Sequence, residues 1–164
     1  NEPKDCIFRI NRDIRFGKDK TPYKTNMACY FNKAGKKGNG AGYYFHIEPG
    51  KSFAAGGIWQ PGTTELASMR QEIDYNFTDW KKIINNPTFK KQFPKGFTEN
   101  EMLTRPPKGY EDSNPAIDFI KLKSFVITKS FTDAELQSKT FVKDVAKTFN
   151  NMLPLIRFLN GAID

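Results

Sequence analysis

GYYFHIEPGKSFAAGGIW, residues 42–59, is the stretch of sequence that decides the fold. Two aromatic-rich runs flank Pro49 and Gly50, and a proline followed by a glycine is typical of the two middle positions of a type II turn. Runs rich in aromatic and small residues on both sides of such a turn favour paired strands. The pattern therefore predicts a β-hairpin in which Glu48 lies opposite Lys51.

The two faces of this hairpin differ in character, because successive residues of a strand point to opposite sides of a sheet. The face predicted to meet the core holds Tyr43, Phe45, Ile47, Ala54 and Ile58. The other face holds Tyr44, His46, Glu48, Lys51, Phe53 and Ala55. Small residues from Ala54 to Gly57 leave room for another backbone or a ligand to approach closely.

Elements on either side of the hairpin complete an α+β pattern. Upstream, alternating apolar residues predict strands at Cys6–Ile10 and Met27–Asn32. Downstream, the pattern predicts helices from Thr63 or Thr64, after Asn86-Pro87 and at Ala116–Leu122, a strand at Lys123–Lys129, and a capping box at Thr132–Glu135. A long C-terminal helix follows from Phe141, and Pro154 is expected to kink or restart it. Strands come mainly first, so we expect one domain, residues 1–164, with an antiparallel sheet packed on one face by helices.

Positive charge is concentrated in the first third of the chain. The 164 residues carry 26 Lys and Arg against 18 Asp and Glu, a formal net charge of +8. Residues 1–51 alone hold 11 basic and 5 acidic side chains. This excess favours an anionic partner, such as a phosphate, a carboxylate or a nucleic-acid backbone. The alternative is a lysine-rich surface that serves only solubility.

Several classes of protein are excluded. The sequence has no apolar run of the roughly 18 residues that a membrane span needs, so no membrane partner is expected. Two separated cysteines, Cys6 and Cys29, and one histidine cannot form a Cys/His zinc site, and no metal is expected. Reduced thiols in a cytoplasmic protein are the preferred interpretation of the cysteines, with a disulfide as the alternative. No P-loop, GxGxxG or HExxH motif is present, so the cofactor is unknown.

The segment Arg9–Tyr23 concentrates the candidate binding residues. Arginine forks match phosphate and carboxylate groups, and Asp13 can order a neighbouring guanidinium through a bidentate pair. The sequence therefore predicts a loop that binds a small anionic ligand through Arg9, Arg12, Asp13, Arg15, Lys20 and Tyr23, beside Tyr44 on the hairpin. The alternative is a network of salt bridges that only holds the loop in place.

His46 is the only histidine, and with Glu48 it is a candidate general base. Asp13 is a further candidate carboxylate. Side chains two residues apart on a strand point the same way with their Cβ atoms about 6–7 Å apart, too far to form a pair by default. A lone histidine on a sheet is more often structural than catalytic.

Arg9–Phe16 (RINRDIRF) followed by Lys20–Tyr23 (KTPY) resembles the signature RxxRDxRF…KxPY of a bacterial family, domain-of-unknown-function family 2461. The resemblance extends to Tyr44–Gly50, Gly57–Trp59 with Pro61, Pro107–Gly109, Pro115–Asp118 and Lys121–Phe125, and so covers nearly the whole chain. It implies no activity. It adds Lys108, Asp118 and Lys123 as candidates, with Lys123 among the binding residues, and it implies a further helical segment before the stretch that starts at Asn1.

Three functions follow from these features. The first is an enzyme or binder that holds a small anion between the Arg9–Tyr23 loop and the face with Tyr44, whether or not it catalyses a reaction. The second is binding of single-stranded nucleic acid by the basic loops Arg9–Lys24 and Lys33–Lys37, although no RNP-like or helix-turn-helix pattern is present. The third is a structural or interaction module whose arginines only hold the fold.

Overall fold

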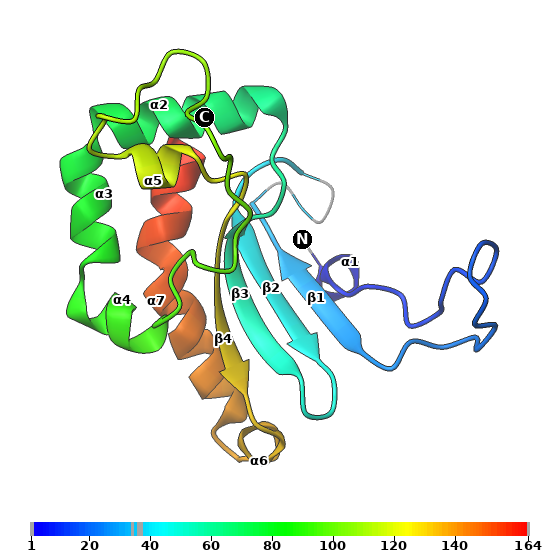
Figure 1. Ribbon diagram of the computed structural model, residues 1–164. Helices are drawn as coiled ribbons and strands as arrows, with labels where there is room; N and C mark the ends of the chain where they lie inside the picture. Colours follow the sequence, from blue (N-terminus) through cyan, green and yellow to red (C-terminus); the bar gives the residue numbers. More distant parts are fainter. Residues whose placement is uncertain (1, 34, 36–37, 164) are drawn as a thin grey trace.

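A four-stranded antiparallel sheet forms the centre of the fold (Figure 1). The computed structural model describes residues 2–33, 35 and 38–163, so residues 34, 36 and 37 of the predicted basic loop lie outside the described residues. The strands are β1 (Met27–Phe31), β2 (Gly42–Ile47), β3 (Ser52–Ile58) and β4 (Phe125–Phe131), and they lie in the order β1-β2-β3-β4. With its helices, this sheet makes the fold α+β, as the sequence predicts.

The predicted hairpin forms from β2 and β3. The amide of Lys51 donates a hydrogen bond of 2.9 Å to the carbonyl oxygen of Glu48 and closes the turn. Gly50 has a φ of +72°, which is the conformation that a type II turn requires at this position. His46 lies opposite Phe53, so the two faces of the hairpin carry the residues that the alternation predicts.

Helices cover one face of the sheet (Figure 1). They are α2 (Thr63–Tyr75), α3 (Phe77–Ile84), α4 (Pro87–Gln92), α5 (Ile117–Ile120) and the long C-terminal α7 (Phe141–Gly161). Phe149 of α7 lies against Tyr43 of β2, with ring centroids 4.9 Å apart. Met152 of α7 packs so closely on Gly56 of β3 that a Cβ there would collide with it. The core therefore lies between this face of the sheet and the helices.

An aromatic cluster fills the core beneath α3. Trp80 is fully buried, and its ring lies 5.5 Å from that of Phe97, 5.2 Å from Phe158 and 6.0 Å from Phe125. Each aromatic ring buries a large apolar area, so such a cluster contributes strongly to stability. Of the helices in the described part of the chain, none is both long and apolar enough to cross a membrane.

Two boundaries differ from the predictions. The residues Cys6–Ile10 do not form a regular strand, because α1 (Pro3–Cys6) ends only at Cys6. Pro3 occupies the first helical turn, where its missing amide hydrogen is not needed. Ile7 then makes an isolated antiparallel bridge to Cys29 of β1.

The C-terminal helix runs unbroken through Pro154 rather than restarting there. A proline inside a helix removes one backbone hydrogen bond. Met152 and Leu155 are fully buried on either side of it, and packing of an apolar face supplies most of a helix's stability in a protein. The late strand β4 also begins at Phe125, two residues after the predicted start at Lys123.

Residues 9–24 form an arm that projects from the β1 side of the sheet, away from the helices (Figure 1). Its two halves run antiparallel, with a bridge between Asn11 and Tyr23 and a hydrogen bond of 2.9 Å from the amide of Arg12 to the carbonyl oxygen of Pro22. None of its residues belongs to the hydrophobic core. The arm is therefore held by its own hydrogen bonds and ion pairs.

Candidate functional site

The face of the sheet opposite the helices carries a cavity of about 710 Å³. Its floor consists of small residues, Gly42 in β2 and Ala55, Gly56 and Gly57 in β3. Gly57 has a φ of +133°, and a Cβ at this position would collide with the carbonyl of Phe125 in β4. The small residues thus admit the neighbouring backbone of β4, as predicted, and leave an open hollow above the sheet.

Aromatic rings surround this floor. Phe8, Tyr30, Tyr44, Phe53 and Trp59 all line the cavity. The ring of Tyr44 lies 6.3 Å from that of Phe8 and 5.7 Å from that of Phe53, in tilted arrangements. Trp59 remains 63% exposed at the mouth. Such walls offer a large apolar contact area to a ligand.

Polar groups at the rim are acidic or neutral. The carboxylate of Glu65 accepts a hydrogen bond of 3.0 Å from the side-chain amide of Asn39. The carboxylate of Glu99 accepts from Lys95 at 2.6 Å and from the hydroxyl of Thr128 at 3.3 Å, and its bond with Lys95 lowers its pKa. Within the described chain, the lining contains no Lys or Arg. Of the two rim carboxylates, that of Glu99 is compensated by Lys95, whereas that of Glu65 has a neutral partner.

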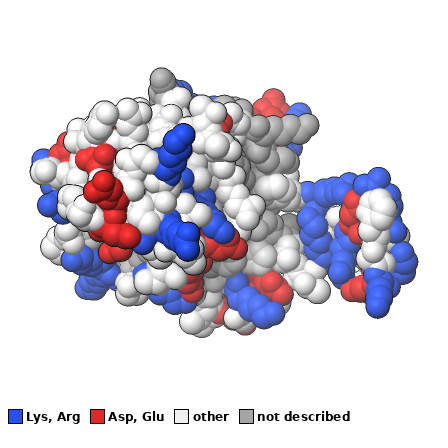
Figure 2. All heavy atoms as spheres, turned by 45° about the horizontal axis from the view of Figure 1, so that its top comes forward, with Lys and Arg blue, Asp and Glu red and all other residues white. Residues whose placement is uncertain are grey.

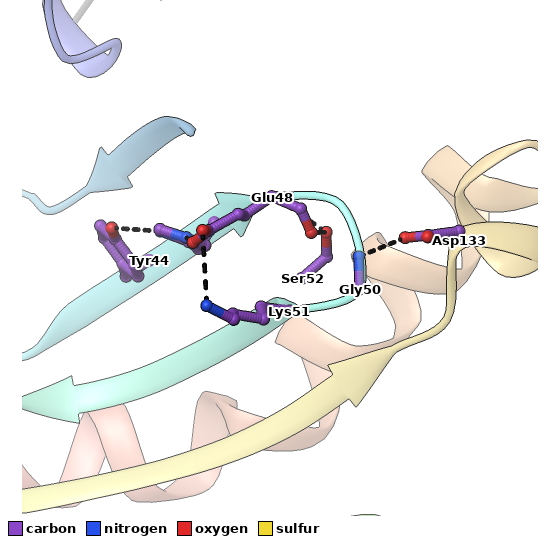
Figure 3. A network of polar contacts seen from close by, with 7 residues as sticks. Tyr44, Glu48, Gly50, Lys51, Ser52 and Asp133 are labelled. Atoms are coloured by element: carbon purple, nitrogen blue, oxygen red, sulfur yellow. Dashed lines mark hydrogen bonds and ion pairs between the residues drawn. The ribbon is translucent and has the colours of Figure 1, made fainter. Parts of the chain in front are cut away.

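A three-residue chain of hydrogen bonds reaches the cavity through Tyr44 (Figure 3). The hydroxyl of Tyr44 lies 3.0 Å from Nδ1 of His46, and Nε2 of His46 lies 3.0 Å from Oε2 of Glu48. The two side chains of His46 and Glu48 lean towards each other, so the expected separation at Cβ does not keep them apart. Such a chain can hold or move a proton.

The turn that carries Glu48 is fixed by further bonds (Figure 3). The amide of Glu48 donates to Oγ of Ser52 at 3.0 Å, and that hydroxyl donates back to the carbonyl oxygen of Glu48 at 2.9 Å. The amide of Gly50 donates at 2.8 Å to Asp133, in the helical turn α6 (Asp133–Leu136) that follows the predicted capping box. Glu48 is thereby held within reach of His46.

The imidazole of His46 is shielded from solvent. Its side chain is 12% exposed, against 23% for Glu48, and its ring stacks on Phe53 with centroids 5.0 Å apart and planes 19° from parallel. Burial also raises the pKa of the Tyr44 hydroxyl, which stays protonated at neutral pH. Hydrogen bonds in such a shielded place are stronger than those in open water.

The arm satisfies part of its charge internally. Arg15 forms the predicted bidentate pair with Asp13, through bonds of 2.9 and 2.7 Å, and these bonds lower the pKa of Asp13. Arg12 pairs with Asp19 and also donates to the hydroxyl of Thr21 at 3.0 Å. These pairs are exposed, so each contributes little to the stability of the fold.

The remaining predicted binding residues lie apart from the cavity. Arg9 lies at the base of the arm, Lys20 donates at 2.7 Å to the carbonyl oxygen of Ile14, and Tyr23 is 61% exposed rather than packed on the sheet. Lys123 pairs with Glu101 at 3.1 Å. The cavity residues found in the described chain include none from the arm. Of the predicted set, the structure joins Tyr44, His46 and Glu48 beside the cavity and, apart from it, Asp13 and Arg15 in the arm.

Metal-binding groups do not gather in the described residues. No three His, Cys, Asp or Glu side chains among them lie close enough to hold an ion, and the carboxylates of Asp13, Glu48 and Asp118 do not converge. Cys6 and Cys29 are free thiols rather than partners in a disulfide.

Sequence reasoning missed most of the cavity wall. Tyr30, Glu65 and Glu99 come from three segments without a shared local pattern, and Glu65 has the ordinary sequence context of a first helical turn. Trp59 lies within the stretch that carries the family resemblance. Strand alternation, by contrast, had placed Tyr44, Phe53 and Ala55 together on one face of the hairpin.

The comparisons with known proteins agree with the resemblance noted in the sequence. A search of curated proteins found no match, and a search of solved structures found none either. A protein family described as "Conserved hypothetical protein (DUF2461)" matches residues 1–158 of the 164. Since the match spans almost the whole chain, the protein belongs to the DUF2461 family of conserved hypothetical proteins.

Proposed function

We propose that this domain binds a small, largely apolar or aromatic molecule in the cavity on the open face of the sheet. The observation that carries the proposal is the combination of an aromatic wall with a floor of glycine and alanine. Ligand sites are typically concave, mostly apolar and furnished with a few polar groups, and a volume of about 710 Å³ lies in their usual range. The carboxylate of Glu65, whose hydrogen-bond partner is the neutral side-chain amide of Asn39, favours a neutral or cationic ligand.

A thermal-shift screen with neutral, cationic and anionic aromatic fragments tests this proposal. A ligand that binds the folded state raises the Tm by an amount that grows with the logarithm of its concentration over Kd. We expect neutral and cationic fragments to raise the Tm and anionic ones to have little effect. The proposal would be contradicted if no aromatic fragment stabilised the protein.

A variant that fills the cavity locates the binding. Ala55→Leu places three extra carbon atoms on the floor, so it should abolish the fragment-induced shift. Ala146→Leu is the matched control, because Ala146 is exposed on α7, which packs on the other face of the sheet. Equal shifts in both variants would place the binding elsewhere.

We also propose, as a second function, that the arm binds an anionic partner. Residues 9–24 hold six Lys and Arg against two Asp, and the arm stands out as a largely basic projection (Figure 2). Asp13 and Asp19 engage Arg15 and Arg12, while Arg9 and Lys24 have no ion pair within the described chain. Uncompensated charge on an exposed projection favours phosphate-bearing partners.

Two titrations separate the anionic partners. Phosphorylated metabolites would raise the Tm of the wild type but not of Arg12→Ala/Arg15→Ala, if the arm binds small anions. Single-stranded oligonucleotides would instead bind with an affinity that falls steeply between low and high salt. Lys143→Ala/Lys147→Ala, with the same loss of charge on the exposed side of α7, is the control. Absence of both effects would leave the arginines a structural role only.

A cytoplasmic location is part of the proposal. The free thiols of Cys6 and Cys29 support a reducing compartment. Cell fractionation tests it directly, and recovery of the protein outside the cytoplasm would contradict it.

A further inference from the structure

Two tyrosine hydroxyls belong to residues that line the cavity, and their hydrogen-bond partners differ in kind. The hydroxyl of Tyr30 donates a hydrogen bond of 3.3 Å to the carbonyl oxygen of Gly40 and accepts one of 3.4 Å from the side-chain amide of Asn32. The donor and acceptor roles of this hydroxyl are therefore fixed by groups that do not titrate. Tyr44 is bonded instead to the imidazole of His46, which can either accept or donate a hydrogen bond.

The carboxylate of Glu48 selects the tautomer of His46. An ionised carboxylate can only accept, so an imidazole with a single proton carries that proton on Nε2, which is 3.0 Å from Oε2 of Glu48. Nδ1 is then left with a lone pair, and the hydroxyl of Tyr44 donates its proton to it. The phenolic oxygen consequently keeps its own lone pairs free for a further donor, and Tyr44 is one of the residues that line the cavity.

The surroundings of His46 contain few other charges. Its neighbours across the sheet are Ala28 on β1 and Phe53 on β3, neither of which titrates. Lys51 approaches Glu48 only at the other carboxylate oxygen, at 3.8 Å. Glu48 is thus the charged group that sets the state of the imidazole.

We propose that Tyr44 is the hydrogen-bond acceptor of the cavity and that the ligand is an apolar or aromatic molecule bearing an O–H or N–H group. His46 and Glu48 act as positioning residues, because they orient the Tyr44 hydroxyl without lining the cavity themselves. This inference rests on the proposed binding of a small molecule in the same cavity. It adds the chemical class of the ligand and the residue that selects it.

A matched pair of probes tests the assignment. 2-Naphthol and 2-methoxynaphthalene have the same ring system, but only the first can donate a hydrogen bond. One added hydrogen bond should make 2-naphthol bind about two- to tenfold more tightly at neutral pH. Tyr44→Phe should abolish this preference, whereas Tyr30→Phe, which removes a hydroxyl from the same cavity, should retain it.

The imidazole signals provide a second readout, which a purely structural role of His46 would not change. Because His46 is the only histidine, its ¹⁵N signals need no assignment. We expect them to show a protonated Nε2 and an unprotonated Nδ1 at neutral pH, and to shift at Nδ1 when 2-naphthol binds. Glu48→Gln should weaken both the tautomer preference and the preference for 2-naphthol.

The outcomes separate this inference from the proposed function. If both probes bind equally well and Tyr44→Phe changes the affinity for neither probe, the role of Tyr44 is overturned while the cavity remains a binding site. A proton on Nδ1 at neutral pH would also overturn it. If neither probe binds, the proposed function and the inference fail together.

Discussion

Asn100 is a single residue that completes the edge of the sheet beside the cavity. Its Oδ1 accepts from the amide of Val126 at 3.0 Å, and its Nδ2 donates at 2.8 Å to the carbonyl oxygen of Val126 and at 3.1 Å to that of Phe97. Val126 lies in β4, at the outer edge of the sheet. The side chain of Asn100 thereby supplies bonds that a further strand would otherwise make.

We expect Asn100→Ala to lower the free energy of unfolding by about 1–3 kcal/mol, because it leaves buried backbone groups without partners. Urea denaturation measures the change as a lower midpoint at an unchanged slope. Asn150→Ala, on the exposed surface of α7, should change stability by less than about 0.5 kcal/mol. Equal effects of the two substitutions would show that water replaces the side chain of Asn100 without loss.

Asp19 is the residue whose ionisation orders the tip of the arm. Hydrogen bonds from the hydroxyl and the amide of Thr21, together with Arg12, lower the pKa of Asp19 from 3.8 to about 2. A lowered pKa means that the stabilisation is fully present above 3.8 and is lost as the pH falls through about 2.

We therefore predict that the amide signal of Thr21 titrates with a midpoint near the lowered pKa of Asp19, about 2. An NMR pH titration of the folded protein measures this directly. In Asp19→Asn the transition should disappear, because the amide side chain does not ionise. A midpoint at the ordinary pKa of 3.8 would mean that these bonds do not form in solution.

At the scale of single elements, β3 is the strand that both the core and the cavity depend on. It pairs with β2 on one side and β4 on the other, and its glycines face Met152 of α7 on one side and the cavity on the other. At Gly57 the φ of +133° and the carbonyl of Phe125 together leave no space for a side chain. This position is the most constrained point of the strand.

Gly57→Ala should destabilise the protein by at least about 1–3 kcal/mol, the usual range for backbone strain alone, with the collision against Phe125 added to it. Gly161→Ala is the contrasting substitution, since Gly161 ends α7 with open space around it, and it should be neutral or slightly stabilising. Thermal unfolding of both variants compares the two sites. A neutral Gly57→Ala would contradict the observed β3–β4 pairing.

At the scale of the whole molecule, the chain divides into a packed body and an exposed arm. The hydrophobic core draws its residues from the sheet and the helices, whereas the arm contributes none. Phe16 of the arm is 90% exposed. Since burial of apolar surface is the main source of stability, the body should fold without the arm.

Replacing residues 12–22 with a short glycine-containing turn should shift the Tm by less than about 3 °C, which corresponds to roughly 1 kcal/mol for a domain of this size. Met152→Ala, in the core, should by contrast cost about 2–5 kcal/mol. Differential scanning calorimetry compares the two. A large loss of stability without the arm would show that it packs on the body in solution.

The predictable part of the fold consists of elements with a strong local pattern. The hairpin of residues 42–59 is correct down to the pairing of His46 with Phe53, because alternation and a Pro-Gly turn specify register locally. The same alternation predicts a strand at Cys6–Ile10. The proline in the first turn favours the helix α1 instead, and that helix includes Cys6, the first residue of the predicted strand. For the candidate site, the sequence indicated Tyr44, His46 and Glu48 but neither the bonds among them nor the cavity beside them.

The sequence by itself determined the α+β class, the hairpin with its two faces, a pairing of Asp13 with a neighbouring arginine, and the family. Each of these depends on residues close together in the chain or on a motif. Only the tertiary structure decided that Phe8, Trp59 and Glu99 share one cavity and that the arm projects away from it. The physical reason is that side-chain orientation and the meeting of distant segments depend on packing, which no short-range pattern encodes.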